Sequence, residues 1–358
     1  MMPRPTSLAW MFVALSAPAC LAAHPIPEAE RWATITHAGN APHIVLGPTG
    51  LPYNQVGAVD HEYQISRTEV TGAEWFEFVQ AYAPYVQEDA VNAFAFTSTS
   101  ITIAGYRQYL LPAANADRPV EIGWHFAARY MNWLHNGKAL TPAAFESGAY
   151  DTSTFGFNAD NSFTDQVSHS PDARYWIPSV DEWIKAAHFD PDRYGDGVPG
   201  YWQYSNASDS PPAFGSPASG GGTSTGGRFN FPLPDVAAYP GTQSPWGLLD
   251  CSGGFSEWTE DAFYSEETGR PFARSIQGSS WRDRYSDSIM LHWDRIDGEQ
   301  HASPVFLFGL RVARAVPGPG GVGVFFCALS FVMKRRRCSD EPLFSCRNLF
   351  DDVRLPRQ

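Results

Sequence analysis

The chain has 358 residues and a formal net charge of −13, because 38 Asp and Glu stand against 25 Lys and Arg. This acidic balance argues against a nucleic-acid partner, since phosphate binding relies on clustered Lys and Arg. It also argues against attachment of the main body to an anionic membrane surface. The 12 Trp, 15 Tyr and 24 Phe exclude a disordered chain, and the 31 Gly and 29 Pro exclude a long-helix protein. The composition therefore predicts a compact, loop-rich and aromatic-rich body.

The N-terminus has the three parts of a secretory signal. Arg4 gives a short positive region, residues 8–21 are apolar, and small residues suited to cleavage follow. We therefore predict a signal peptide over residues 1–23 and an exported protein. A buried first helix is an alternative that Pro18 disfavours. A lipid anchor on Cys20 is a second alternative, although the residues before it fit a lipidation motif poorly.

Three helices of the body are predicted from capping and periodicity. The first begins at the capping box Thr71-x-x-Glu74 and continues with apolar residues at helical spacing. The second runs from about Gly123 to His135, and Gly137 stands where a glycine commonly ends a helix. The third begins at the capping box Ser179-x-x-Glu182 and must end before Pro191.

The remainder of the body consists of short alternating segments and loops. Residues 63–68 and 307–314 are predicted to be brief strands. Residues 205–227 are rich in Ser, Gly and Pro, and we predict a long surface loop there. No strong internal boundary occurs, so a single domain is predicted over residues 24–315. Its lone cysteine, Cys251, allows neither a disulfide framework nor a cysteine-based zinc site and is interpreted as a small buried residue.

The C-terminal end differs from the body. A Pro- and Gly-rich segment precedes the apolar residues 322–333, and the basic cluster Lys334–Arg337 would hold that end in the cytoplasm. This arrangement resembles the PEP-CTERM sorting signal, although Gly318 replaces its acidic residue and the chain continues beyond the cluster. We predict a membrane anchor over residues 316–337 and a tail over residues 338–358. A plain short anchor and a buried core helix are the alternatives.

Six segments of the body stand out in chain order. They are Ser66–Thr71, Pro119–Trp124, Tyr175–Trp183, Trp246–Trp258, Gln277–Trp281 and Phe308–Ala313. Together they resemble the formylglycine-generating (sulfatase-modifying factor) enzyme family, over roughly residues 35–315. The resemblance implies an α+β, loop-rich, single-domain fold that is C-type-lectin-like and binds several Ca²⁺ ions.

The chemistry of that family does not carry over. The resemblance implies oxidation of a sulfatase cysteine to formylglycine by copper held on two cysteines, and soft thiolates are ligands that Cu(I) prefers. The aligned positions are Asp283 and Ser288, and neither supplies a thiolate. We therefore predict no catalytic residues and a non-catalytic ligand-binding or structural module. The alternative is a divergent formylglycine-generating-type oxidoreductase that uses another metal site.

One calcium motif of the family is retained. The resemblance implies that the side chains of Asp250 and Glu257 and the carbonyls of Gly253 and Phe255 hold a structural Ca²⁺, for which hard oxygen ligands are suitable. The alternative is that Asp250 caps a turn while Glu257 makes a surface salt bridge. The second calcium motif of the family begins at Asn230, but its downstream loop is shortened.

Aromatic and charged residues lie around the aligned catalytic positions. Rings beside guanidinium and carboxylate groups suit a carbohydrate or peptide ligand, because they combine stacking area with oriented polar groups. The alternative is a satisfied ion-pair network that includes Arg311. The candidate groove residues are Trp281, Arg282, Arg284, Trp293 and Arg295.

Overall fold

The computed structural model describes residues 25–46, 51–86, 93–225, 233–282, 300–302 and 306–318. The chain divides into two units, Met1–Val316 and Pro317–Gln358, and all described helices and strands belong to the first. The predicted signal peptide, the apolar and basic parts of the predicted anchor and the tail lie outside the described residues. Within the described ranges, no helix is long and apolar enough to cross a membrane.

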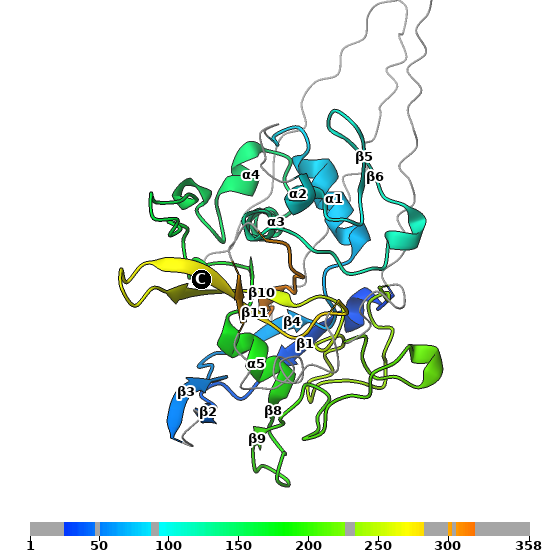
Figure 1. Cartoon of the computed structure of the whole chain (residues 1–358), viewed down its shortest axis with the longest axis vertical. Helices are drawn as coiled ribbons and strands as arrows, with labels where there is room; N and C mark the ends of the chain where they lie inside the picture. Colours follow the sequence, from blue (N-terminus) through cyan, green and yellow to red (C-terminus); the bar gives the residue numbers. More distant parts are fainter. Residues whose placement is uncertain are drawn as a thin grey trace, which may run out of the picture. The chain divides into compact units, whose positions relative to one another are not determined.

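A four-stranded antiparallel sheet joins the two ends of the domain (Figure 1). Its order is β1-β4-β13-β7, and Ile65 of β4 faces Ala33 on one side and Ala313 on the other. The strand predicted over 63–68 is present in a shorter form, and β13 with bridges at Phe308 and Gly309 replaces the continuous strand predicted over 307–314. The strands are β1 (Trp32–Ile35), β4 (Tyr63–Ser66), β7 (Tyr175–Trp176) and β13 (Ala313–Ala315).

A second sheet, of order β10-β11-β12, carries the longest hairpin of the domain. Its strands are β10 (Glu257–Tyr264), β11 (Pro271–Gln277) and β12 (Gln300–Ala302). Three two-stranded hairpins complete the described strands. They pair β2 (His43–Leu46) with β3 (Pro52–Val56), β5 (Thr102–Gly105) with β6 (Gln108–Leu110), and β8 (Phe189–Asp190) with β9 (Gly200–Tyr201).

The three predicted helices are confirmed. Both capping boxes form, at Thr71 with Glu74 and at Ser179 with Glu182. Gly137 adopts φ +64 after the second helix, the left-handed conformation that glycine favours at a helix end. In Figure 1, α1 to α4 lie on one side of the central strands and α5 on the other. The helices are α1 (Gly72–Tyr82), α2 (Ala93–Thr97), α3 (Trp124–His135), α4 (Pro142–Glu146) and α5 (Val180–His188), with 3₁₀ turns at Glu28–Glu30, Ala113–Asn115, Thr152–Thr154 and Pro217–Ser219.

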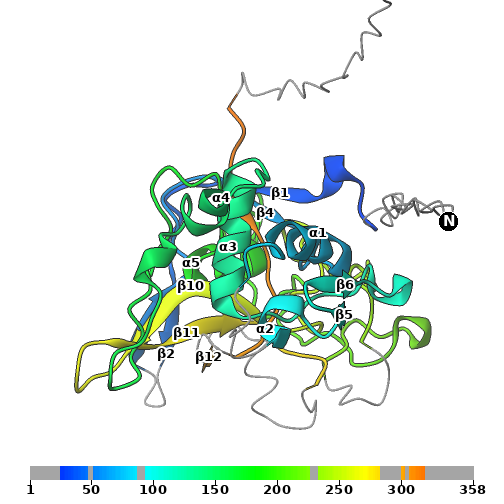
Figure 2. The same ribbon diagram turned by 90° about the horizontal axis from the view of Figure 1, so that it is seen from above.

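Aromatic packing holds the helices together. The Phe78 ring of α1 is fully buried and lies 5.5 Å from the Tyr130 ring and 5.9 Å from the Trp133 ring, both on α3. Phe145 of α4 lies 6.1 Å from the same ring. Figure 2 shows α3 and α4 side by side. Tilted and edge-on ring pairs of this kind stabilise a core beyond the area that they bury.

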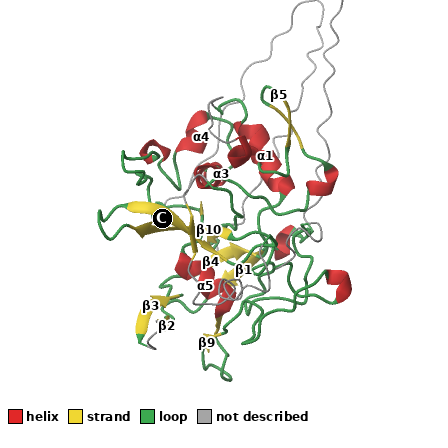
Figure 3. Ribbon diagram, in the orientation of Figure 1, coloured by secondary structure: helices red, strands yellow, loops and turns green. Residues whose placement is uncertain are grey.

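The segment over 205–227 corrects one prediction. Much of it is loop, as Figure 3 shows, but the last three of its described residues are not at the surface. Thr223, Ser224 and Thr225 are fully buried, because their hydroxyls bond to other buried groups instead of water. Thr223 Oγ1 lies 2.9 Å from Ser252 Oγ, and Ser224 Oγ accepts from the Gly254 amide at 2.9 Å. A run of Ser and Thr is polar in sequence yet can fold inward when its hydroxyls find partners.

Candidate functional site

The segment Asp250–Glu257, here called the motif loop, coils tightly before β10. Asp250, Gly253 and Gly254 have φ values of +59, +88 and +64, a region that L-residues rarely adopt. The loop also packs closely: a Cβ on Gly253 would lie 2.5 Å from Ser224 Oγ, and one on Gly254 would overlap Glu69 Oε2. Glycine is therefore required at both positions by conformation and by space.

Some backbone carbonyls of the motif loop accept hydrogen bonds from the described residues and others do not. The Gly254 carbonyl accepts from the Trp281 amide at 3.0 Å. The carbonyls of Gly253 and Phe255 accept no hydrogen bond from the described residues, although both residues are buried. Carbonyls without donors are uncommon in buried residues, and these two are the ones that the family motif gives to calcium.

Glu69 closes the motif loop from the segment between β4 and α1. The residue is 1% exposed, and its Oε1 accepts from the Phe255 amide at 3.0 Å. Its Oε2 is buried without a hydrogen-bond partner. Burial raises the pKa of Glu69 well above its usual value, and the charges of Glu257 and Asp250 raise it further.

Glu257, in contrast, is fully engaged. Arg311 donates from Nη2 to Oε1 at 2.8 Å and from Nε to Oε2 at 3.0 Å, and both residues are buried. The indole Nε1 of Trp183 donates to Oε2 at 2.8 Å. The salt bridge expected of Glu257 as the alternative to calcium therefore exists, but it lies in the core and not at the surface.

Asp250 keeps one oxygen open. Its Oδ2 accepts from the Ala237 amide at 2.6 Å, while Oδ1 accepts no hydrogen bond from any described residue. Burial raises the pKa of Asp250 to about 6. Among the described residues, the carboxyl groups of Glu69, Asp250 and Glu257 share one guanidinium, that of Arg311. When all three are ionised, this cation would leave two negative charges uncompensated.

The donor set around the motif loop fits a Ca²⁺ ion. Hard carboxylate and carbonyl oxygens are the ligands that Ca²⁺ prefers, and its charge matches the uncompensated charge. Among the residues that the structure describes, no three His, Cys, Asp or Glu side chains converge on one point. The fit therefore depends on backbone carbonyls as well as on side chains.

The structure brings the four residues of the calcium motif into one loop and places two of the groove residues beside it. Arg282 lies with its guanidinium 5.3 Å from the Phe255 ring and bonds Glu121 Oε1 at 2.6 Å. Trp281 contacts the loop through its amide. The other predicted positions, Asn230, Asp283, Arg284, Ser288, Trp293 and Arg295, lie outside the described residues.

Cys251 lies within the motif loop and is a poor source of thiolate. It is 5% exposed, and its Sγ lies 3.8 Å from the Leu249 carbonyl oxygen. Burial raises the pKa of its thiol to about 12. A thiol that stays protonated at neutral pH is neither a strong nucleophile nor a ready metal ligand.

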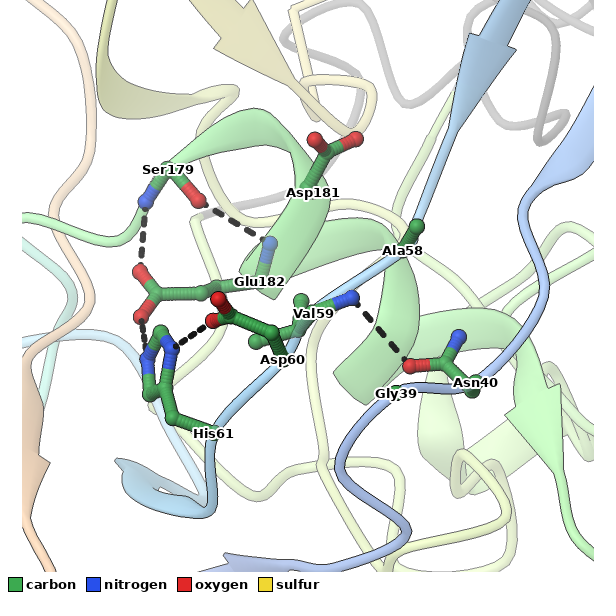
Figure 4. A pocket seen from close by; sticks show the side chains of 9 residues that line it. All are labelled: Gly39, Asn40, Ala58, Val59, Asp60, His61, Ser179, Asp181 and Glu182. Atoms are coloured by element: carbon green, nitrogen blue, oxygen red, sulfur yellow. Dashed lines mark hydrogen bonds and ion pairs between the residues drawn. The ribbon is translucent and has the colours of Figure 1, made fainter.

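A second polar site is a pocket at the start of α5, with a cavity volume of about 410 Å³ (Figure 4). Its walls come from Gly39–Asn40, Ala58–His61 and the first turn of α5. Glu182 is 2% exposed, and its Oε1 bonds His61 Nε2 at 2.9 Å. Asp181 Oδ1 accepts from the Gly57 amide at 2.7 Å. These side chains hold the walls of the pocket together.

His61 is the titratable group of this pocket. Its Nδ1 lies 3.0 Å from Asp60 Oδ1, so both ring nitrogens meet carboxylates. The hydrogen bond to Glu182 is the largest cause that raises the pKa of His61 to about 9. The imidazole therefore carries a positive charge at neutral pH.

Two residues around the motif loop were not part of the predicted calcium set. Glu69 lies in a segment that carries the family resemblance, and a single acid between Thr68 and Val70 was a usable signal. Arg311 was expected only in an ion-pair network around the groove. Neither contact with the motif loop is readable from spacing, since Glu69 and Phe255 lie 186 positions apart.

Comparison with known proteins supports the family. A model of the sulfatase-modifying factor enzyme 1-like domain matches residues 38–316. No curated protein matches the chain. Among solved structures, CarF is 19% identical, covers 80% of this chain and 98% of its own, and has a TM-score of 0.46. Variable protein 1 of Treponema denticola is 18% identical, covers 80% and 95%, and has a TM-score of 0.46. The predicted loop-rich α+β fold class is confirmed, and the chain belongs to the family of sulfatase-modifying factor enzyme 1-like domains.

Proposed function

We propose that this chain is a non-catalytic member of its family, an exported and surface-anchored module that is stabilised by Ca²⁺ and binds a carbohydrate or peptide. The burial of Cys251, the one cysteine among the described residues, is the observation that carries this proposal. Asp283 and Ser288 stand at the positions of the copper ligands, and Cys251 is buried with a pKa of about 12. These residues support a domain without a soft ligand pair for copper.

Turnover with a sulfatase-motif peptide tests the absence of catalysis. Purified protein, with and without added copper, should leave the peptide cysteine unmodified in mass spectra. Copper-dependent formation of formylglycine would contradict the proposal. Metal analysis of the same sample addresses the alternative, because copper or iron near one atom per chain would favour a divergent oxidoreductase.

Two features of the described residues support the calcium part of the proposal: the carbonyls of Gly253 and Phe255 accept no hydrogen bond there, and neither does Asp250 Oδ1. An ion that binds the native state only adds about 2.7 kcal/mol of stability at a hundredfold excess over Kd. Chelation should therefore lower the melting temperature by roughly 5–10 °C, and Ca²⁺ should restore it. Mg²⁺ should substitute poorly, since it demands a smaller octahedral shell.

Replacing a ligand tests the same site. Asp250→Ala should abolish the response of the melting temperature to Ca²⁺. Glu266→Ala, on the exposed turn between β10 and β11, is a suitable control that should keep it. A wild-type melting curve that does not respond to chelator would show that the motif loop is only a turn.

The exposed face beside the motif loop supports the ligand-binding part. Arg282 has 42% of its side chain exposed, between the Phe255 ring and the Glu121 carboxylate. A combined glycan and peptide array with the purified protein tests this part. Arg282→Ala and Trp281→Ala should each weaken any binding found, whereas an array without reproducible binders would favour a purely structural module.

Localisation follows from the two ends of the sequence. The signal-like residues 1–23 and the anchor-like residues 316–337 support export and surface attachment. Cell fractionation should find the protein outside the cytoplasm, and deletion of residues 316–337 should release it in soluble form. Full-length protein in the cytosol would contradict this part.

A further inference from the structure

The carboxylates around the motif loop differ in how many of their oxygens remain available. Both oxygens of Glu257 are taken by Arg311 and Trp183. To coordinate a cation, Glu257 would have to give up part of a buried bidentate ion pair, which is costly. The family motif therefore assigns calcium to a carboxylate whose two oxygens already accept three hydrogen bonds in this fold.

Glu69, in contrast to Glu257, keeps one carboxylate oxygen without a hydrogen-bond partner among the described residues. It is 1% exposed, its Oε1 bonds the Phe255 amide, and its Oε2 has no partner although it is buried. This oxygen occupies the space where a Cβ of Gly254 would lie, and Gly254 stands in sequence between Gly253 and Phe255, whose carbonyls accept no hydrogen bond from the described residues. A buried, unpartnered carboxylate oxygen is expensive unless something binds it.

We propose that Glu69 supplies the second carboxylate of the calcium site, together with Asp250, in the place that the family motif gives to Glu257. The inference depends on the proposed calcium binding and names which residues achieve it. Glu257 then serves as the partner of Arg311, and its role is structural. The site joins the segment before α1 to the start of β10, so bound Ca²⁺ should link two distant parts of the chain.

Glu69→Gln separates a ligand from a structural residue. The amide oxygen of Gln can still accept from the Phe255 amide, so a purely structural role survives the change. The anionic Oε2 is lost, and calcium affinity should fall at least tenfold in calorimetric titration with CaCl₂. Tb³⁺ luminescence excited through tryptophan should weaken in parallel. Without calcium, the variant should melt no lower than the calcium-free wild type, because a buried carboxyl whose second oxygen has no partner is replaced by an uncharged amide of the same shape.

Glu121→Gln is a matched control. Glu121 is also 1% exposed, also keeps one buried oxygen without a partner, and pairs with Arg282 instead of touching Gly254. Its substitution should leave calcium affinity unchanged. Glu69→Asp, which keeps the charge and shortens the reach, should weaken binding less than Glu69→Gln does and serves if the glutamine variant fails to fold.

The outcomes distinguish calcium binding itself from the role of Glu69 as a ligand. If the wild type does not bind Ca²⁺, the calcium site itself is wrong and the role of Glu69 falls with it. If the wild type binds and Glu69→Gln binds equally well, calcium stands and the assignment to Glu69 is overturned. Equal losses in the Glu69 and Glu121 variants would also overturn it, since the effect would then come from any buried glutamate.

Discussion

Two buried glutamates of this domain each accept a hydrogen bond from a tryptophan, but they pair with different cationic side chains. Glu257 accepts an indole N–H from Trp183, and Glu182 accepts one from Trp176. Glu257 pairs with Arg311, which is fully buried, whereas the partner of Glu182 is His61, whose side chain is 48% exposed. One pair lies in the core beside the motif loop and the other forms a wall of the pocket at α5.

The difference lies in which conditions can break each pair. A guanidinium stays charged at every pH that a protein survives, so the cation of the Glu257 pair does not titrate. An imidazolium loses its charge when pH exceeds its pKa, so the Glu182 pair also responds to solvent. A buried glutamate is thus paired with a cation that does not titrate in one region and with a cation that titrates in the other.

Removing the permanent cation should have the largest effect. Arg311→Met leaves Glu257 buried without its ion pair and frees the carbonyls of Ser66 and Leu249, which Arg311 also bonds. We expect a loss of about 3–5 kcal/mol in the free energy of unfolding, measured by urea denaturation. Arg314→Met, on the partly exposed β13, should cost about 1 kcal/mol. Equal costs would contradict the special status of the Glu257 pair.

The close packing of the motif loop should give the next largest effect. Gly254→Ala places a methyl group onto Glu69 Oε2 at φ +64, and we expect a loss of about 1–3 kcal/mol. Gly269 is a matched control, since it has the same φ of +64 with nothing within 4 Å of the added Cβ. Thermal melts of Gly254→Ala and Gly269→Ala separate the cost of the clash from the cost of the positive φ. Similar melting temperatures would show that the Glu69 side chain moves aside at little cost.

The titratable pair should give the smallest effect, and only at alkaline pH. The pKa of His61 is raised to about 9 in the folded protein, above the value of about 6.5 for an unfolded imidazole. Its stabilisation is therefore complete below pH 6.5 and is lost as pH rises through 9. Because the side chain is half exposed and screened by water, we expect a loss of about 1 kcal/mol.

His61→Gln should remove this part of the pH dependence. Unfolding curves between pH 6 and pH 10 for the variant should be flatter than those for the wild type, and His37→Gln, at an exposed turn, should leave the wild-type slope unchanged. Identical slopes for His61→Gln and wild type would assign the alkaline loss to another group.

Local features of the fold were predictable from the sequence, and long-range contacts were not. The capping boxes at Thr71 and Ser179 act within four residues, so spacing alone located two helices. The pocket at α5 joins residues near Asn40 to others near Glu182, and no periodicity relates them. The buried end of the Ser- and Gly-rich loop was wrongly predicted as surface, because composition does not reveal which hydroxyls find partners.

The candidate site shows the same limit at the level of atoms. The motif loop was recognisable as a family signature, including Asp250 and Glu257. Which carboxylate oxygen stays free depends on Arg311 and on Trp183, and both contacts are made only when the chain folds. A motif can therefore identify the residues of a site without showing which of their oxygens is free to bind a cation.

The order of strands in the first sheet has a consequence for synthesis. β13 ends at Ala315 and lies between β4 and β7, so it is an interior strand contributed by the last part of the domain. The sheet cannot be completed until that segment has left the ribosome, and its pairing with β4 spans most of the domain sequence. Such non-local pairing delays folding. A nascent chain of this topology can thus close its first sheet only after residues 313–315 have emerged.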